Sequence, residues 1–347
     1  MQLNAHFVGS IGLSDVEEVF RTVGGALGTH LKRIPDGEPG GRRVWISWQY
    51  PVLLANPLLE SEDVPPAGRG PGFRRFRLAK GVKPEELQFG ELGYAREARA
   101  SYQDFLAARR CGDIAPSVRF QVSLPTPINV IGSQCAKDAV LVVEPAYETA
   151  MLREIDKLCR AIPHQDLAIQ FDMVREIIWW DGRLGAQQPA PFANVEAQVV
   201  ARLGRIARAV PPDVELGFHI CYGDWGGRHH IQPADMGAMV ALANAIVAGV
   251  GRPVTYFHMP VPIDRDDGRY FAPLRDLRDA EQTELYLGLV HLGDGFAGAE
   301  RRIASARNFR DNFGIATECG LGRAKRPDTV KAIVGLYAEI CAKASAG

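Results

Sequence analysis

Short apolar runs rich in β-branched residues recur along the whole chain, and segments with helical periodicity separate most of them. Eight such runs can be recognised, each closing on Gly, Pro or a polar residue: AHFVGSI from Ala5, THLKRIPDGE from Thr29, SVRFQVSLP from Ser117, DLAIQFDM from Asp166, VELGFHICYG from Val214, VTYFHMPV from Val254, ELYLGLVHLGD from Glu284 and FGIATECGL from Phe313. Strands that alternate eight times with helices are typical of a (β/α)8 barrel of the TIM type. We therefore predict an α/β fold of this kind, with a doubly wound open sheet as the alternative.

The intervening segments have the spacing of amphipathic helices. Residues 143–162 are the clearest case, because their apolar side chains recur at steps of three and four: Met151, Leu152, Ile155, Leu158, Cys159 and Ile162. The segments VEAQVVARLGRIARAV and MGAMVALANAIVAGV behave in the same way. Each of them predicts a helix with one apolar face turned toward a core.

One stretch between the second and third predicted strands departs from this alternation. It covers roughly residues 39–116 and includes a helix near residues 92–110 in addition to loop-like sequence. We interpret this stretch as an insertion that covers the barrel mouth and not as a separate domain. A length of 347 residues fits one α/β barrel, so we predict a single domain over residues 1–347.

Composition and charge exclude several classes of protein. The formal net charge is -1, so no overall field favours nucleic acid or an anionic membrane. No apolar run reaches the roughly 18 residues that a membrane helix needs, and the N-terminal segment lacks the pattern of a signal peptide. The six cysteines are scattered and form no CxxC pair, which argues against a disulfide framework. We expect a cytoplasmic protein that acts on small molecules.

Polar and reactive side chains gather where the predicted strands end. In barrels of this type the loops at the C-terminal ends of the strands form the open face, and the chemistry takes place there. The residues at these ends, in strand order, are Gly9, Ser10, Asp36, Glu38, Asp172, His219, Cys221, His258, His291, Asp294 and Cys319. The predicted topology therefore collects them around one rim.

Three of these residues have the chemistry of zinc ligands. Residues two apart on a strand point the same way, so His219 and Cys221 should converge. Cys319, from a different strand end, adds a third soft ligand, and such a set suits zinc. The fourth ligand could be His258, Glu318, a water molecule or the substrate, since catalytic zinc keeps one position open. The alternative is that His219 and Cys221 only pack in the core.

Carboxylates at the same rim suggest a site for a polar substrate. Asp172 closes a strongly apolar strand, where a buried carboxylate is costly unless it is paired. A substrate ammonium or hydroxyl group could pair with it, and an N-cap role for the following helix is the alternative. Glu38, in DGEPGG, could be an ordinary turn residue. Gly9 and Ser10 offer backbone N–H groups to a carboxylate or phosphate.

Six segments resemble, in order and in strand position, the motifs of a known family: FVGSI, DGEPGGR, LPTPINVI, IQFDM, HICYG and TECGLGR. The family is the catalytic C-terminal half of cobalamin-independent methionine synthase, together with the wider group of barrel enzymes that move methyl or alkyl groups onto zinc-bound thiols. The resemblance runs through nearly the whole chain. It implies a zinc-dependent methyltransferase on a (β/α)8 barrel.

The resemblance also implies roles for individual residues. Zinc would be held by His219, Cys221 and Cys319. The amino group of an amino-acid thiol, with homocysteine as the first candidate, would be held by Glu38 and Asp172. Gly9 and Ser10 would lie near the carboxylate of that substrate. A tetrahydrofolate-type compound is a candidate methyl donor.

Two places depart from the family pattern. Where the family supplies a glutamate ligand from strand six, this chain has His258, which we predict as the fourth zinc ligand. The strand-seven segment reads VHLGDG, so the general acid that protonates the leaving group would be His291 or, as second choice, Asp294.

Two further hypotheses come from other functional classes. The first is a metal-free lyase or decarboxylase like the uroporphyrinogen decarboxylase group of barrels, with Asp172 at its centre. The second is a non-catalytic barrel that binds a small ligand or stores metal. The metal content of the purified protein separates the first of these from the zinc-dependent transferase.

Overall fold

A curled sheet of seven parallel strands forms the centre of the protein. The computed structural model describes residues 3–64, 73–183, 189–223, 231–278, 283–323 and 326–346. The strands follow one another around the sheet in chain order: β1 (Arg33–Pro35), β4 (Arg119–Pro125), β5 (Leu167–Met173), β6 (Glu215–Ile220), β7 (Tyr256–Pro260), β8 (Glu284–Gly288) and β9 (Gly314–Ile315). Each neighbouring pair is parallel. The predicted α/β barrel architecture is therefore confirmed.

The first predicted strand, from Ala5, forms isolated bridges instead of a regular strand. Ala5 bridges in parallel to Leu31 on one side and to Ile315 on the other. The His6 amide donates to the Ile315 carbonyl over 2.9 Å, and the Ala5 amide donates to the His30 carbonyl over 2.8 Å. This segment thus lies between the edge strands β1 and β9, and its pairing is too short to form a regular strand.

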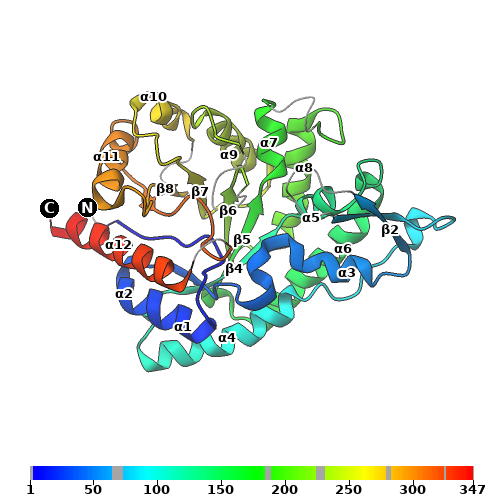
Figure 1. Ribbon diagram of the computed structural model, residues 1–347, viewed down its shortest axis with the longest axis horizontal. Helices are drawn as coiled ribbons and strands as arrows, with labels where there is room; N and C mark the ends of the chain where they lie inside the picture. The colour runs from blue at the N-terminus through cyan, green and yellow to red at the C-terminus, as the bar shows by residue number, and fades with distance from the viewer. Residues whose placement is uncertain are drawn as a thin grey trace.

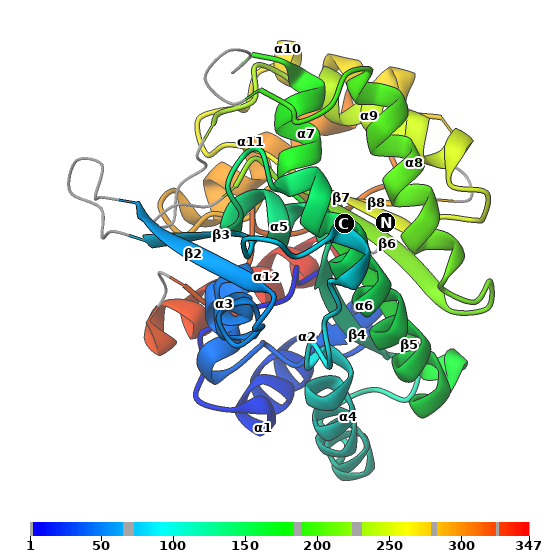
Figure 2. The same cartoon turned by 90° about the vertical axis from the view of Figure 1, so that its right-hand side faces the viewer.

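Helices surround the strands (Figures 1 and 2). The longer ones are α4 (Tyr94–Cys111), α6 (Val140–Ala161), α8 (Val195–Arg208), α9 (Gly237–Gly249), α11 (Gly295–Arg307) and α12 (Pro327–Ala346). The shorter ones are α1 (Val16–Val19), α2 (Gly25–Leu27), α3 (Tyr50–Leu54), α5 (Pro127–Gln134), α7 (Arg175–Asp181) and α10 (Gly268–Phe271). The apolar face predicted over residues 143–162 is the buried face of α6, with Met151, Ile155 and Leu158 fully enclosed. Within the described ranges, no helix is both long and apolar enough to cross a membrane.

The chain between β1 and β4 holds several extra elements. After the 3-10 helix η3 (Gly40–Gln49) and α3 comes an antiparallel hairpin of β2 (Leu59–Val64) and β3 (Phe73–Leu78), which projects from the body (Figure 2). The Phe76 carbonyl accepts a hydrogen bond of 2.9 Å from the Ala136 amide, so the hairpin is fastened beside the end of α5. The predicted covering of the barrel mouth by this segment stays a prediction.

A charged and aromatic layer fills the N-terminal end of the barrel. The Arg33 side chain is 1% exposed and forms ion pairs with Glu215 and, over 2.9 Å, with Glu284. Its guanidinium lies 4.3 Å from the centre of the Tyr256 ring. Gly217 leaves room for that ring, because a Cβ atom there would lie 2.1 Å from it. Side chains therefore close this end of the barrel, and the predicted site residues lie at the opposite end.

Amide side chains form the next layer inside the barrel. The Gln170 amide accepts from His6 Nε2 over 2.9 Å and donates to the Val8 carbonyl over 2.6 Å. Gln121 donates to the Phe7 carbonyl over 2.9 Å. Buried polar groups require such partners. These bonds hold the N-terminal segment inside the barrel and fix the orientation of Gln170 toward the strand ends.

Candidate metal centre

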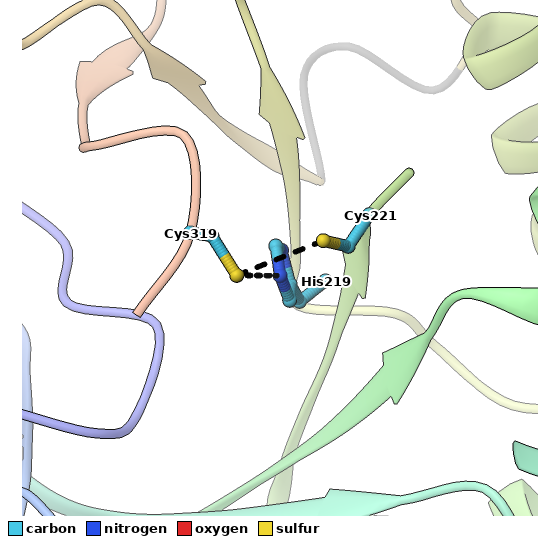
Figure 3. A group of neighbouring side chains, drawn as sticks. All are labelled: His219, Cys221 and Cys319. Atoms are coloured by element: carbon cyan, nitrogen blue, oxygen red, sulfur yellow. Dashed lines mark hydrogen bonds between the residues drawn. The ribbon is translucent and has the colours of Figure 1, made fainter. Parts of the chain in front are cut away.

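The structure brings together three of the four predicted metal ligands: His219, Cys221 and Cys319. The Cys221 amide donates to the Met173 carbonyl over 2.8 Å, so strand pairing continues beyond β6 and both side chains emerge on one side. The two sulfur atoms lie 3.7 Å apart, and Cys319 Sγ lies 3.8 Å from His219 Nε2. All the ligand atoms lie within 4.8 Å of one another, pointing together from β6 and from the loop after β9 (Figure 3).

The donor set fits a zinc ion. A tetrahedral ion with Zn–S distances of about 2.3 Å and Zn–N distances of about 2.0–2.1 Å sets two sulfur ligands about 3.8 Å apart and a sulfur and a nitrogen about 3.6 Å apart. The separations of 3.7 Å and 3.8 Å agree with these values. The hydrogen bond with Cys319, and then burial, raise the pKa of the Cys221 thiol well above its ordinary value. Neighbouring buried thiols therefore need a cation before both can ionise.

His258, the predicted fourth ligand, lies behind His219 and outside this group. The two histidines are register partners on β6 and β7. His258 Nδ1 lies 2.6 Å from His219 Nδ1, and His258 Nε2 lies 2.9 Å from the Thr317 carbonyl oxygen. The ring is completely buried. Each of its nitrogens therefore faces a protein group that is not one of the sulfurs.

The carboxyl group of Asp172 lies beside the cluster, and that of Glu38 lies near Asp172. Asp172 is the register partner of His219, and its side chain accepts from Gln170 Nε2 over 2.8 Å. Burial outweighs that hydrogen bond and raises the pKa of Asp172 well above its usual range. Burial, followed by the nearby Asp172 and Asp36 carboxyls, raises the pKa of Glu38 in the same way. Raised pKa values favour the protonated forms of the two carboxyls, and a nearby cation such as an ammonium group favours the ionised forms.

Gly9 and Ser10 lie where the first and last strand segments meet. A Cβ atom at Gly9 would lie 2.8 Å from a Glu38 carboxyl oxygen, so glycine allows that carboxyl to approach the backbone. The Ser10 carbonyl accepts from the Leu321 amide over 2.6 Å. Ser10 Oγ accepts from the Gly322 amide over 3.3 Å. Ser10 therefore holds the loop that carries Cys319 against the start of the chain.

The two predicted general acids, His291 and Asp294, each contact other groups of the protein. His291 Nε2 donates to the Val261 carbonyl over 2.8 Å, and burial together with the charge of Arg302 lowers the pKa of His291 to about 4. Asp294 forms two contacts with Arg302, of 2.7 and 2.9 Å. Burial alone would raise the pKa of Asp294, but Arg302 lowers it below its ordinary value. The role of these two residues as general acids stays a prediction.

Sequence reasoning did not identify several residues that support the site. Gln170 orients Asp172, and the Thr317 carbonyl orients His258. The spacing of residues on one face of a strand could have identified both. Gln170 lies two residues before Asp172, and Thr317 lies two residues before Cys319. Trp45 has an unusual backbone conformation, with φ 52° and ψ -112°. Its side chain lowers the pKa of Asp172. Its buried indole nitrogen nevertheless makes no hydrogen bond of good geometry. No sequence signal indicates this conformation of Trp45.

Comparisons with known proteins agree with the predicted architecture. The sequence matches no protein-family model, and no curated protein matches it. Among solved structures, it is similar to a B12-independent methionine synthase from Shewanella sp. W3-18-1 in complex with selenomethionine, with a TM-score of 0.62 and 11% identity over 100% of this chain and 98% of that chain. It is also similar to a putative vitamin-B12 independent methionine synthase from Listeria monocytogenes, with a TM-score of 0.56 and 13% identity over 98% and 99%.

A third solved structure is described as a methyltransferase from Methanosarcina mazei, with a TM-score of 0.51 and 12% identity over 97% of this chain and 94% of that one. At identities this low, the likeness establishes a shared fold over the full chain. The resemblance to the methionine synthase family that the sequence motifs predict is therefore confirmed for the fold.

Proposed function

We propose that this protein is a zinc-dependent transferase that moves a methyl or alkyl group onto a thiol, with homocysteine as the first candidate acceptor. The observation that carries the proposal is the group of His219, Cys221 and Cys319, whose ligand atoms lie within 4.8 Å of one another at the C-terminal ends of the barrel strands. The shared fold with proteins described as methionine synthases and a methyltransferase supports it. Fold likeness alone would not, since one barrel fold hosts many reactions.

The residues of the chain divide the work in this proposal. Zinc held by His219, Cys221 and Cys319 would keep the acceptor thiol ionised at a fourth position. Glu38 and Asp172 bind the amino group of the acceptor, because two closely placed carboxyls with raised pKa values favour a cation between them. Holding the acceptor at both its sulfur and its nitrogen orders it for attack, and such positioning supplies much of the rate in a displacement reaction.

Metal content and thiol binding test this function directly. We expect about one zinc per chain in the purified protein. In the cobalt-substituted protein, homocysteine should change the visible spectrum, because a new sulfur ligand enters the coordination sphere. As a control, the Cys111→Ser variant should behave like the wild type in both measurements, since Cys111 is an exposed free thiol outside the three-residue cluster. Absence of zinc together with failure to take it up would overturn the proposal in favour of the metal-free lyase hypothesis, whereas zinc without a response to thiols would favour a non-catalytic barrel.

Binding of an amino-thiol should become tighter as the pH rises. In the ligand-free protein, burial and the neighbouring Asp172 and Asp36 carboxyls raise the pKa of Glu38 and favour its protonated form, whereas an ammonium group favours the ionised form. Binding therefore expels a proton, and the affinity increases as the pH rises toward the raised pKa of Glu38. Calorimetry in buffers of different ionisation enthalpy measures this release. The Glu38→Gln variant should release fewer protons than the wild type, while equal release by the two proteins would contradict the role of Glu38.

A further inference from the structure

We infer that His258 is a positioning residue that fixes the tautomer of His219 and thereby directs the lone pair of His219 Nε2 toward the two sulfurs. The inference rests on the proposed function in one respect only, which is that His219 Nε2 binds the metal. It differs from the prediction that His258 is itself a ligand. The argument depends on which ring nitrogen of each histidine carries hydrogen.

The Thr317 carbonyl determines the tautomer of His258. A carbonyl oxygen only accepts hydrogen bonds, and it lies 2.9 Å from His258 Nε2, so this nitrogen carries the hydrogen. The ring is completely buried, where a charged imidazolium would be costly. In a neutral imidazole with hydrogen on Nε2, Nδ1 is an acceptor.

The tautomer of His258 in turn determines that of His219. Their Nδ1 atoms lie 2.6 Å apart, a distance that requires one hydrogen between them. Because His258 Nδ1 accepts, His219 Nδ1 must donate. The hydrogen of the His219 ring is then on Nδ1, and Nε2 presents its lone pair on the side where Cys319 Sγ lies at 3.8 Å. A metal-binding histidine normally donates its other ring N–H to a partner of this kind.

The fold supplies both ends of this chain of contacts. Register pairing of β6 with β7 puts His219 beside His258. Thr317 belongs to the loop that carries Cys319, and its hydroxyl donates to the Cys319 carbonyl over 2.9 Å. The same loop therefore provides one metal ligand and orients another through His258. Metal binding by either nitrogen of His258 would break its contact with His219 or its contact with the Thr317 carbonyl.

Nitrogen-15 NMR of the histidine-labelled, metal-free wild-type protein tests the inference without any variant. We expect hydrogen on Nδ1 of His219 and on Nε2 of His258. Hydrogen on Nε2 of His219 in the wild type, or a doubly protonated His258, would overturn the inference. This measurement is independent of the proposed function, because a protein that binds no zinc can still show or lack the expected tautomers.

Variants at His258 separate positioning from direct ligation. His258→Phe keeps a ring but removes the acceptor, so zinc affinity measured by chelator competition should fall about 10- to 100-fold. X-ray absorption should show the same number of nitrogen and sulfur ligands as in the wild type, whereas loss of one nitrogen would make His258 a ligand and overturn the inference. His258→Gln, which carries both an acceptor and a donor, should retain more affinity than His258→Phe.

His6→Phe is the matched control for these variants. His6 lies in the same barrel interior, with its ring centre 5.8 Å from that of His258, and its Nε2 bonds to Gln170 and not to a ligand of the cluster. It should leave zinc affinity within a few-fold of the wild type. A loss as large as that of His258→Phe would show that any disturbance of the barrel interior weakens the site, and the specific role of His258 would then be overturned.

Discussion

Replacement of either Cys221 or Cys319 by serine should remove the metal and lower thiol methylation by about a thousandfold or more. Metal activation of a nucleophile contributes several kcal/mol, and each 1.4 kcal/mol or so changes a rate about tenfold. The two sulfurs lie 3.7 Å apart, so each variant leaves one thiol and one imidazole, which is too few soft ligands for a tight zinc site. Zinc content by mass spectrometry and methyl transfer to homocysteine measure both losses.

The other cysteines provide matched controls for this prediction. Cys111 is exposed, and Cys341 is buried in α12, away from the three-residue cluster. Cys111→Ser and Cys341→Ala should retain zinc and activity. A Cys221 or Cys319 variant that keeps full turnover without metal would refute the zinc mechanism, and one that keeps the metal would show that the ligands lie elsewhere.

Replacement of Arg33 by methionine should lower the free energy of unfolding by about 3 kcal/mol. Breaking a buried ion pair typically costs about 3–5 kcal/mol, and the lower end applies because the partner side chains of Glu215 and Glu284 are 23% and 29% exposed. The variant also loses the guanidinium over the Tyr256 ring. Urea denaturation followed by circular dichroism measures the change.

An exposed ion pair gives the comparison for Arg33. Arg74 and Asp63 pair over 2.8 Å on the hairpin, with side chains that are 49% and 80% exposed. Arg74→Met should change the unfolding free energy by less than about 1 kcal/mol. The folded Arg33→Met protein should still bind zinc, because Arg33 lies at the closed end of the barrel. Equal destabilisation by the two substitutions would contradict the structural role assigned to Arg33.

The alternation of strands with helices and part of the site could be predicted from the sequence, because both depend on local periodicity. The alternation of apolar runs with helical segments predicted the barrel, and the spacing of His219 and Cys221 predicted their shared direction. Adding Cys319 required only the rule that the ends of parallel barrel strands meet at one rim. The first strand was less regular than predicted, since the run at Ala5 pairs through isolated bridges.

Local periodicity predicted where the two carboxyl residues and the two proposed general acids lie along the chain, but it did not predict the surroundings of their side chains. Asp172 and Glu38 were recognised as rim residues, but their raised pKa values depend on how deeply the fold buries them and on their mutual approach. His291 and Asp294 also end a strand in the sequence. The pKa of His291 is lowered first by burial and then by the charge of Arg302, a residue on α11 that also forms the ion pair with Asp294 and that no motif connects to the site.

By itself the sequence determined the class of fold and predicted that His219, Cys221 and Cys319 converge, because side-chain direction along a strand follows from backbone geometry and the ends of parallel barrel strands meet at one rim. Only the tertiary structure decided the place of His258. Its contacts with His219 and with the Thr317 carbonyl depend on the register between two strands and on the path of a loop about sixty residues away in the sequence. Register and burial are properties of the packed chain, and they place His258 against His219 and the Thr317 carbonyl.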